Sequence, residues 1–162
     1  MSRNVNSSLS VQRVVGLAAL AGARSMAGPA LLIRHLNRHP SRRLKRRWKV
    51  LQKSRTANIL TLLAIGEMIG DKLPTAPNRT TRAALTGRGI AGVVIGSALF
   101  KRSRRSPGWG AAVGAASALA GAYATFYLRK QLSDATSVPD PVWGGVEDLL
   151  VIKAGQRLLK QQ

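Results

Sequence analysis

A formal net charge of +20 over 162 residues, with 16 glycines, no cysteine and 4% aromatic residues, excludes several classes of protein. Without cysteine, the chain can form neither a disulfide framework nor a thiolate metal site. Glycines inside apolar runs argue against a water-soluble core, because each one weakens a soluble helix by about 1 kcal/mol. In transmembrane helices, glycine instead allows close helix packing. The charge alone would favour nucleic acid, but most Lys and Arg residues lie between the apolar runs, which favours a membrane surface.

The first apolar segment, residues 14–33, is long enough to cross a membrane. A hydrocarbon core of about 30 Å needs about 20 residues of helix. Only Arg24 and Pro29 interrupt this segment. We therefore predict one crossing helix here.

A basic loop, residues 34–56, separates the first two segments. The loop has no acidic residue, and its ten basic residues are Arg34, Arg38, Arg42, Arg43, Lys45, Arg46, Arg47, Lys49, Lys53 and Arg55. The second segment, 57–73, is short and carries Glu67, Asp71 and Lys72 towards its end. The prolines that follow it remove backbone donors and end the helix.

The third and fourth segments are predicted at 83–100 and 109–128. The third contains Arg88 and ends at a second basic cluster, which consists of Lys101, Arg102, Arg104 and Arg105. The fourth has Trp109 at one end and three aromatic residues at the other, as in the interfacial belts of a spanning helix. A polar loop at 129–141 is predicted to be aqueous.

The fifth segment, 142–159, carries Glu147, Asp148, Lys153 and Arg157. It either crosses the membrane, lies in the interface or packs inside the bundle, and the sequence leaves these three alternatives open. Short basic loops stay on the cytoplasmic side. With five crossings, both basic clusters would therefore face the cytoplasm, the amino terminus would lie outside and the carboxyl terminus inside.

These segments predict an all-α, polytopic helical bundle of four to five short, glycine-rich transmembrane segments in one membrane domain, 1–162. The pattern is typical of a multi-pass protein of the bacterial cytoplasmic membrane. Arginine and acidic segments recur along the chain, so an internal helical-hairpin repeat competes with simple convergence of membrane-compatible composition. Paired small residues, such as Gly92 with Gly96 and Gly110 with Gly114, predict close helix packing.

Charges inside apolar segments need a partner, a wet cavity or a function. The predicted intramembrane charge network comprises Arg24, Glu67, Asp71, Lys72, Arg88, Glu147, Asp148 and Lys153. Glu67 and Asp71 are four residues apart and share a helix face, with Gly66 and Gly70 as a predicted contact strip. One interpretation is a cation or proton site; the other is charge pairing, in which Glu67 binds Arg24 or Arg88 and Glu147 or Asp148 takes the other arginine.

The basic clusters are predicted to contact anionic lipid or an acidic partner. The residues concerned are Arg42, Arg43, Lys45, Arg46, Arg47, Trp48, Lys49, Lys101, Arg102, Arg104 and Arg105. Membrane topology, anionic headgroups and nucleic-acid phosphates are alternative explanations, with nucleic acid the least favoured. His35 and His39 are four residues apart, but no cysteine or nearby acid completes a metal site. The sequence indicates no cofactor and no catalytic arrangement, so we expect no enzyme.

Several motifs resemble one family. They are GARSMAGPALL, GEMIGDKLP, PNRTTRAALTGRGIAG, GAYATFYLRK and the PD-x-VxxxVEDLLVI pattern from Pro139 to Ile152. Together they are similar to the bacterial membrane proteins grouped as domain of unknown function 4126, over nearly the whole chain from Gly16 to Ile152. The resemblance implies a compact helical membrane protein and supplies no catalytic or binding residue. The enlarged basic loop and Lys153 depart from the family pattern and leave room for a partner-binding role.

Two functions from different classes follow. The first is a small transporter or channel for ions or small solutes, with the charge network as its polar interior. The second is a structural or accessory subunit that docks through its basic loops on anionic lipid or an acidic partner, or on another copy of itself. Acids that face a cavity would favour transport, and acids buried against arginine would favour the accessory subunit.

Overall fold

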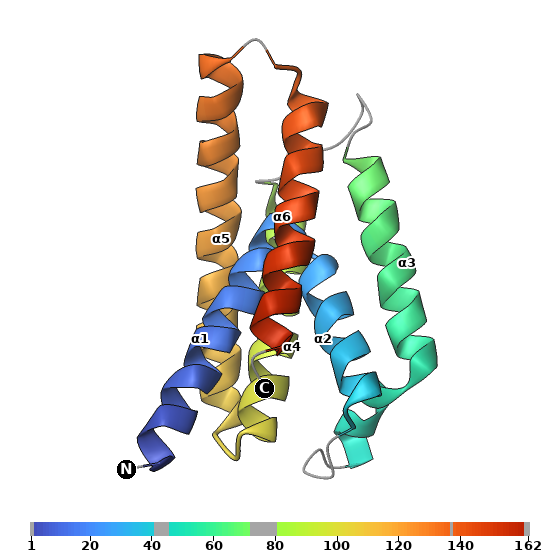
Figure 1. Cartoon of the computed structure of the whole chain (residues 1–162), viewed down its shortest axis with the longest axis vertical. Helices are drawn as coiled ribbons and strands as arrows, with labels where there is room; N and C mark the ends of the chain where they lie inside the picture. Colours follow the sequence, from blue (N-terminus) through green and yellow to red (C-terminus); the bar gives the residue numbers. More distant parts are fainter. Residues whose placement is uncertain (1, 41–45, 72–80, 137, 161–162) are drawn as a thin grey trace.

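The computed structural model describes residues 2–40, 46–71, 81–136 and 138–160, in which every regular element is a helix (Figure 1). The elements in chain order are α1 (Ser2–Ala23), α2 (Ala27–Arg38), the 3₁₀ helix η1 (Arg46–Gln52), α3 (Ser54–Gly70), α4 (Arg82–Arg102), α5 (Pro107–Ala135) and α6 (Asp140–Lys160). The predicted all-α class is confirmed.

The boundaries of α4 and α5 follow from their sequences. The Thr81 hydroxyl accepts a hydrogen bond from the Ala84 amide at 3.4 Å and caps α4. Pro107 begins α5, where its missing N–H costs nothing. The helix continues seven residues beyond the predicted end at residue 128, because strong helix formers such as Arg129 and Lys130 follow. The loop before α6 is correspondingly short.

The prediction of one crossing helix at 14–33 is wrong. α1 ends at Ala23, the chain turns at 24–26, and α2 runs back towards the end of the molecule from which α1 started (Figure 1). Pro29 lies in the first turn of α2, where proline is tolerated. The segment therefore forms a helical hairpin, and its turn is held inside the molecule.

Glycines hold α1, α4 and α5 in close contact at the centre of the fold. A Cβ added to Gly96 would lie 1.8 Å from the Gly110 carbonyl oxygen, and one added to Gly92 would lie 2.3 Å from the Gly114 oxygen. The predicted close packing of these strips is confirmed. By contrast, no heavy atom of the described chain lies within 4 Å of a Cβ at Gly66 or Gly70, so the strip predicted on α3 makes no such contact there.

The outer surface of the bundle is strongly apolar. Large apolar side chains are exposed on α3, α5 and α6: Ile59, Leu62, Leu63, Ile65, Ile69, Trp109, Leu119, Tyr123, Tyr127, Leu128, Val142, Val146, Leu149 and Leu150. Among the described residues, the two helices Arg82–Arg102 and Pro107–Ala135 are long and apolar enough to cross a membrane.

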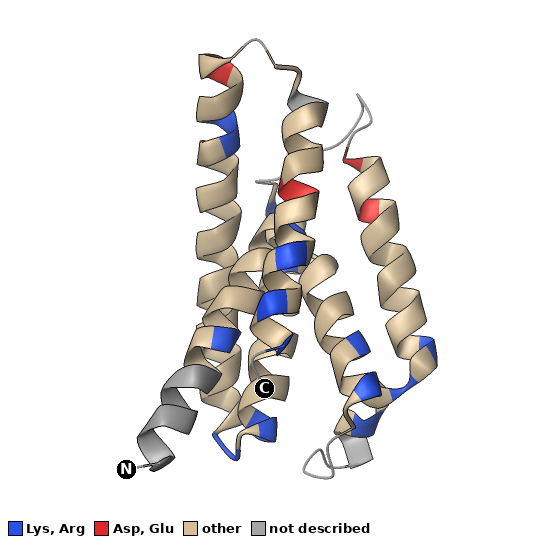
Figure 2. Cartoon of the chain, in the orientation of Figure 1, with Lys and Arg blue, Asp and Glu red and all other residues tan. Residues whose placement is uncertain are grey.

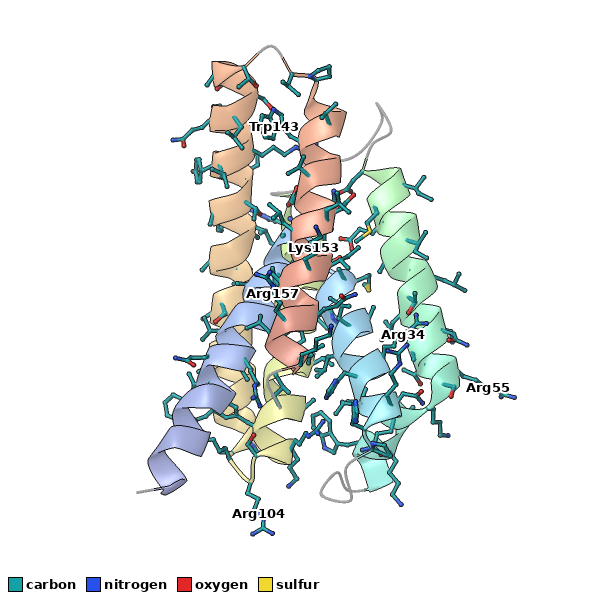
Figure 3. All side chains as sticks on the ribbon, viewed as in Figure 1. Arg34, Arg55, Arg104, Trp143, Lys153 and Arg157 are labelled. Carbon is teal, nitrogen blue, oxygen red and sulfur yellow. The ribbon has the colours of Figure 1, made fainter. Side chains whose placement is uncertain are left out.

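The charges are separated along the long axis of the molecule. Lys and Arg residues gather at the end that holds η1 and the α4–α5 turn, whereas acidic residues lie nearer the other end (Figure 2). Arg34, Arg55 and Arg104 all lie towards the basic end (Figure 3). The start of α1 lies at this end too, so the expectation that it lies opposite the basic clusters is wrong. The hairpin turn is the reason, because it returns the chain to the side from which it came.

The two arginine segments that suggested an internal repeat have different structures. Arg24 lies in the turn of a broken helix, whereas Arg88 lies within the continuous helix α4. The acidic pairs differ as well, because Glu67 lies at the end of α3 and Glu147 lies in the first half of α6. The structure therefore gives the repeat no support.

Candidate functional site: a buried arginine cluster beside a basic groove

Arg24 is the centre of a charge cluster at the α1–α2 turn. Its side chain is 0% exposed and forms an ion pair with Asp71, at the end of α3. On α6, Asp148 lies with Oδ1 2.6 Å from the Arg24 Nε, an ion pair rather than a well-directed hydrogen bond. The Gly144 carbonyl oxygen lies 3.5 Å from the Arg24 Nη2. One buried guanidinium thus joins α1, α3 and α6.

Glu67 binds the backbone of the same turn. Its Oε1 accepts hydrogen bonds from the Ser25 amide at 2.8 Å and the Ser25 hydroxyl at 2.7 Å, and its Oε2 accepts one from the Met26 amide at 2.8 Å. The first amides of a helix have no partner inside it, and the helix dipole favours an anion there. Glu67 therefore caps the start of α2 from a neighbouring helix.

This geometry corrects the expected pairing of Glu67 with an arginine. Glu67 and Asp71 do share a face of α3, as their spacing predicts, but that face meets two different kinds of partner. Asp71 neutralises Arg24, while Glu67 satisfies peptide groups of the turn. The acidic face thereby attaches α3 to the hairpin. Of the two acids paired with Arg24, Asp71 is more exposed than Asp148, with 23% of its side chain accessible to solvent against 10%.

Glu147 has a partner that the sequence did not indicate. Its Oε2 lies 3.4 Å from the Nη1 of Arg129, in the part of α5 that extends past the predicted end. Both side chains are largely buried, at 14% and 15% exposed. In the sequence, the only indication that Arg129 could pair with an acid is its position directly after an apolar run.

The predicted network has three further residues: Arg88, Lys153 and Lys72. Arg88 is buried in α4, with 5% of its surface exposed. Lys153 is exposed on α6 (Figure 3). Lys72 lies outside the described residues. The central cluster thus includes Arg24, Glu67, Asp71 and Asp148, together with the backbone of the turn.

A groove runs between α2, α3 and α6, from the basic end towards this cluster. Its volume is about 1060 Å³, and its inner part reaches Ala27 and Met68. Charged and imidazole side chains line its outer part: Arg34, His35, Arg38, His39, Arg102 and Lys160. No carboxylate lines it among the residues that the structure describes. The groove is therefore suited to an anion at its mouth.

The predicted basic contacts are only partly described. Arg42, Arg43 and Lys45 lie outside the described residues, and Arg46 and Arg47 lie in η1. Lys49 and Arg104 are exposed, Lys101 is half-buried, and the Arg105 guanidinium carbon lies 5.0 Å from the centre of the Phe100 ring.

Two residues of the basic clusters, Trp48 and Arg102, are not simply exposed on the surface. Trp48 is half-buried and packs against the hydrophobic core. Arg102 lines the groove.

Sequence reasoning missed the groove itself, because its walls come from helices far apart in the chain. No group of three or more His, Cys, Asp or Glu residues with a metal-holding arrangement occurs in the described ranges.

A family model for a domain of unknown function, DUF4126, matches residues 12–154. The chain belongs to the DUF4126 family. The matched range contains the whole Arg24 cluster and most of the groove, including all of its α2 and α3 walls. Searches of curated proteins and of solved structures gave no match to this DUF4126 chain.

Replacing Glu67 in this DUF4126 protein by leucine should destabilise the hairpin. The Ser25 and Met26 amides would lose their acceptors, and each buried donor left without a partner costs about 1–3 kcal/mol. Glu67→Gln should cost less, because it keeps one acceptor oxygen. Unfolding in detergent, followed by circular dichroism, would measure both variants against the exposed-site control Asp134→Asn. Equal losses for leucine and glutamine would contradict the capping role.

Proposed function

We propose that the protein is a multi-pass protein of the bacterial cytoplasmic membrane that transports an anionic solute through the groove between α2, α3 and α6. The observation that carries the proposal is the groove itself, about 1060 Å³ in volume, with basic side chains at its mouth and no carboxylate among its described lining. Such a mouth attracts anions and raises their local concentration.

The apolar outer surface supports the membrane location. Soluble monomers rarely expose contiguous apolar patches of more than a few hundred Å², yet large apolar residues such as Leu62 and Leu150 are 68% and 62% exposed. Helices α3, α4, α5 and α6 would cross the bilayer, and α1 and α2 would form a re-entrant hairpin. A buried turn is tolerated at membrane depth when protein groups satisfy its backbone, as Glu67 does here. The basic end would face the cytoplasm.

In this proposal the Arg24 cluster closes the inner end of the groove. Met68 and Ala27 line the groove next to the cluster, while Arg24 itself is fully buried. Helix α3 packs mainly on α2 and η1, and Glu67 and Asp71 attach its far end to the hairpin. Breaking these contacts would let α3 move away from α6. We propose α3 as the element whose movement opens the path.

The transport proposal predicts anion flux that depends on the groove cations. Purified protein in liposomes would be assayed with a panel of hydrophilic and amphipathic anions, and separately with protons and cations. The double variant Arg34→Gln/Arg38→Gln should slow anion flux at least several-fold at equal folded amounts. The matched double variant Lys53→Gln/Arg55→Gln removes the same charge at exposed positions outside the groove and should keep the wild-type rate.

An accessory subunit is the second candidate, and the closed state of the Arg24 cluster favours it. Arg24 is 0% exposed and forms ion pairs with Asp71 and Asp148. In this second candidate, the only role of the cluster is to hold the helices together. Correctly folded wild-type protein that carries no anion across the whole panel would overturn the transport proposal and leave this function. Equal slowing by both double variants would overturn the role of the groove.

A further inference from the structure

The groove changes from basic to apolar along its length. The side chains that line the part beyond the basic mouth are mainly apolar: Ala30, Leu31, Ala64, Ile65, Met68 and Ile152. Helix α2 forms one wall along its full length, from Ala27 at the cluster to Arg38 at the basic end. A helix rises about 1.5 Å per residue, so the 12 residues of α2 give a wall of about 18 Å.

That length matches half of a bilayer. The hydrocarbon core is about 30 Å thick, so one leaflet contributes about 15 Å. In the proposed membrane placement, the groove would begin among cations at the headgroup level and end inside the protein, near the middle of the bilayer. Its volume of about 1060 Å³ is also slightly above the range of about 300–1,000 Å³ found for small-molecule pockets. A small hydrophilic anion would leave the apolar part unfilled.

We propose that the occupant of the groove is an anionic phospholipid from the leaflet at the basic end. Its phosphate would lie among Arg34, Arg38 and Arg102, and an acyl chain would follow the apolar wall towards Met68. Guanidinium groups bind phosphate through paired, charge-assisted hydrogen bonds. The inference deepens the proposed function, on which it rests, by naming an amphipathic anion as the class of molecule that the groove accepts.

The acyl-chain part of the proposal can be tested by filling the groove. Thr61 lines the groove, whereas its neighbour Leu62 is 68% exposed and lies outside the lining. Protein would be extracted from vesicles of equal parts phosphatidylglycerol and phosphatidylcholine, and native mass spectrometry would count the lipids retained. Wild type and Leu62→Trp should retain phosphatidylglycerol in excess over phosphatidylcholine, and Thr61→Trp should lose most of it.

The headgroup part is tested by the mouth cations. Arg34→Gln/Arg38→Gln should lower the retained phosphatidylglycerol several-fold, while Lys53→Gln/Arg55→Gln, at exposed positions outside the groove, should retain the wild-type amount. Circular dichroism would establish that each variant is folded before its lipids are counted. Inorganic phosphate, added to the detergent-solubilised protein at matched concentration, should not displace the lipid, because it lacks the chain that fills the apolar wall.

Each result bears on one proposal separately. Equal retention of the two lipids, unchanged retention in Thr61→Trp, or displacement by inorganic phosphate would overturn the lipid assignment. Flux of hydrophilic anions without lipid retention would overturn it too, while leaving the transport proposal in place. Selective phosphatidylglycerol retention without any anion flux would support the lipid site and overturn transport. A dimer broken by Thr61→Trp but not by Leu62→Trp, without bound lipid, would assign the groove to a second copy.

Discussion

Replacing Arg24 by methionine is expected to cause the largest loss of folded protein among single substitutions in the charge cluster. Met fills much of the same volume but leaves Asp71 and Asp148 without their shared cation. Removing one partner of a buried ion pair costs about 3–5 kcal/mol, because an uncompensated charge stays buried. The free energy of unfolding in detergent or bicelles would measure the loss.

Matched controls separate the cluster from general charge removal. Arg157→Met removes an exposed arginine from α6 and should change stability by about 0.5 kcal/mol or less. The double variant Arg24→Met/Asp148→Asn should recover part of the loss, because one of the two carboxylates that lose the arginine is neutralised together with it. Strictly additive losses would show that Arg24 and Asp148 do not interact.

The second large effect is expected at the α4–α5 contact. Gly96→Ala places a methyl group 1.8 Å from the Gly110 carbonyl oxygen, a distance that only a shift of the backbone can relieve. Overpacked sites lose about 1–3 kcal/mol and occasionally more, and here the contact is backbone against backbone. Thermal unfolding of the purified protein would show a markedly lower midpoint for this variant.

Gly89 on the same helix is the control for this substitution. No heavy atom of the described chain lies within 4 Å of a Cβ at Gly89. Gly89→Ala should therefore be neutral or slightly stabilising, since alanine is favoured over glycine in a helix interior by about 1 kcal/mol. A similar loss for both variants would mean that helix propensity, and not the close approach of α4 to α5, sets the effect.

Much of the fold could be predicted from local sequence. The apolar runs placed α3, α4 and α6 within three residues of their observed ends, and the start of α5 within two. The hairpin at 14–33 could not be predicted, because length alone made this segment a crossing helix. Its turn depends on Glu67, which lies more than 40 residues away in the chain.

The glycines show the limit of motif reasoning most clearly. Gly66 with Gly70 and Gly92 with Gly96 have the same spacing, and both pairs were expected to pack. Of these two pairs, Gly92 and Gly96 pack against the backbone of another helix, whereas Gly66 and Gly70 meet no heavy atom of the described chain within 4 Å of an added Cβ. A small residue permits a close approach, but the partner is set by where the neighbouring helix lies.

The sequence by itself determined the helical class, the family and the charged intervals between apolar runs, because these depend on composition and on short-range spacing. Tertiary structure decided the partner of each charge and the existence of the groove. Arg24 meets Asp71 and Asp148 at sequence separations of 47 and 124 residues. Several arginines and acids carry complementary charges, so charge alone left their pairing open. Helix packing selects the pairing, because it brings Arg24 within contact distance of Asp71 and Asp148.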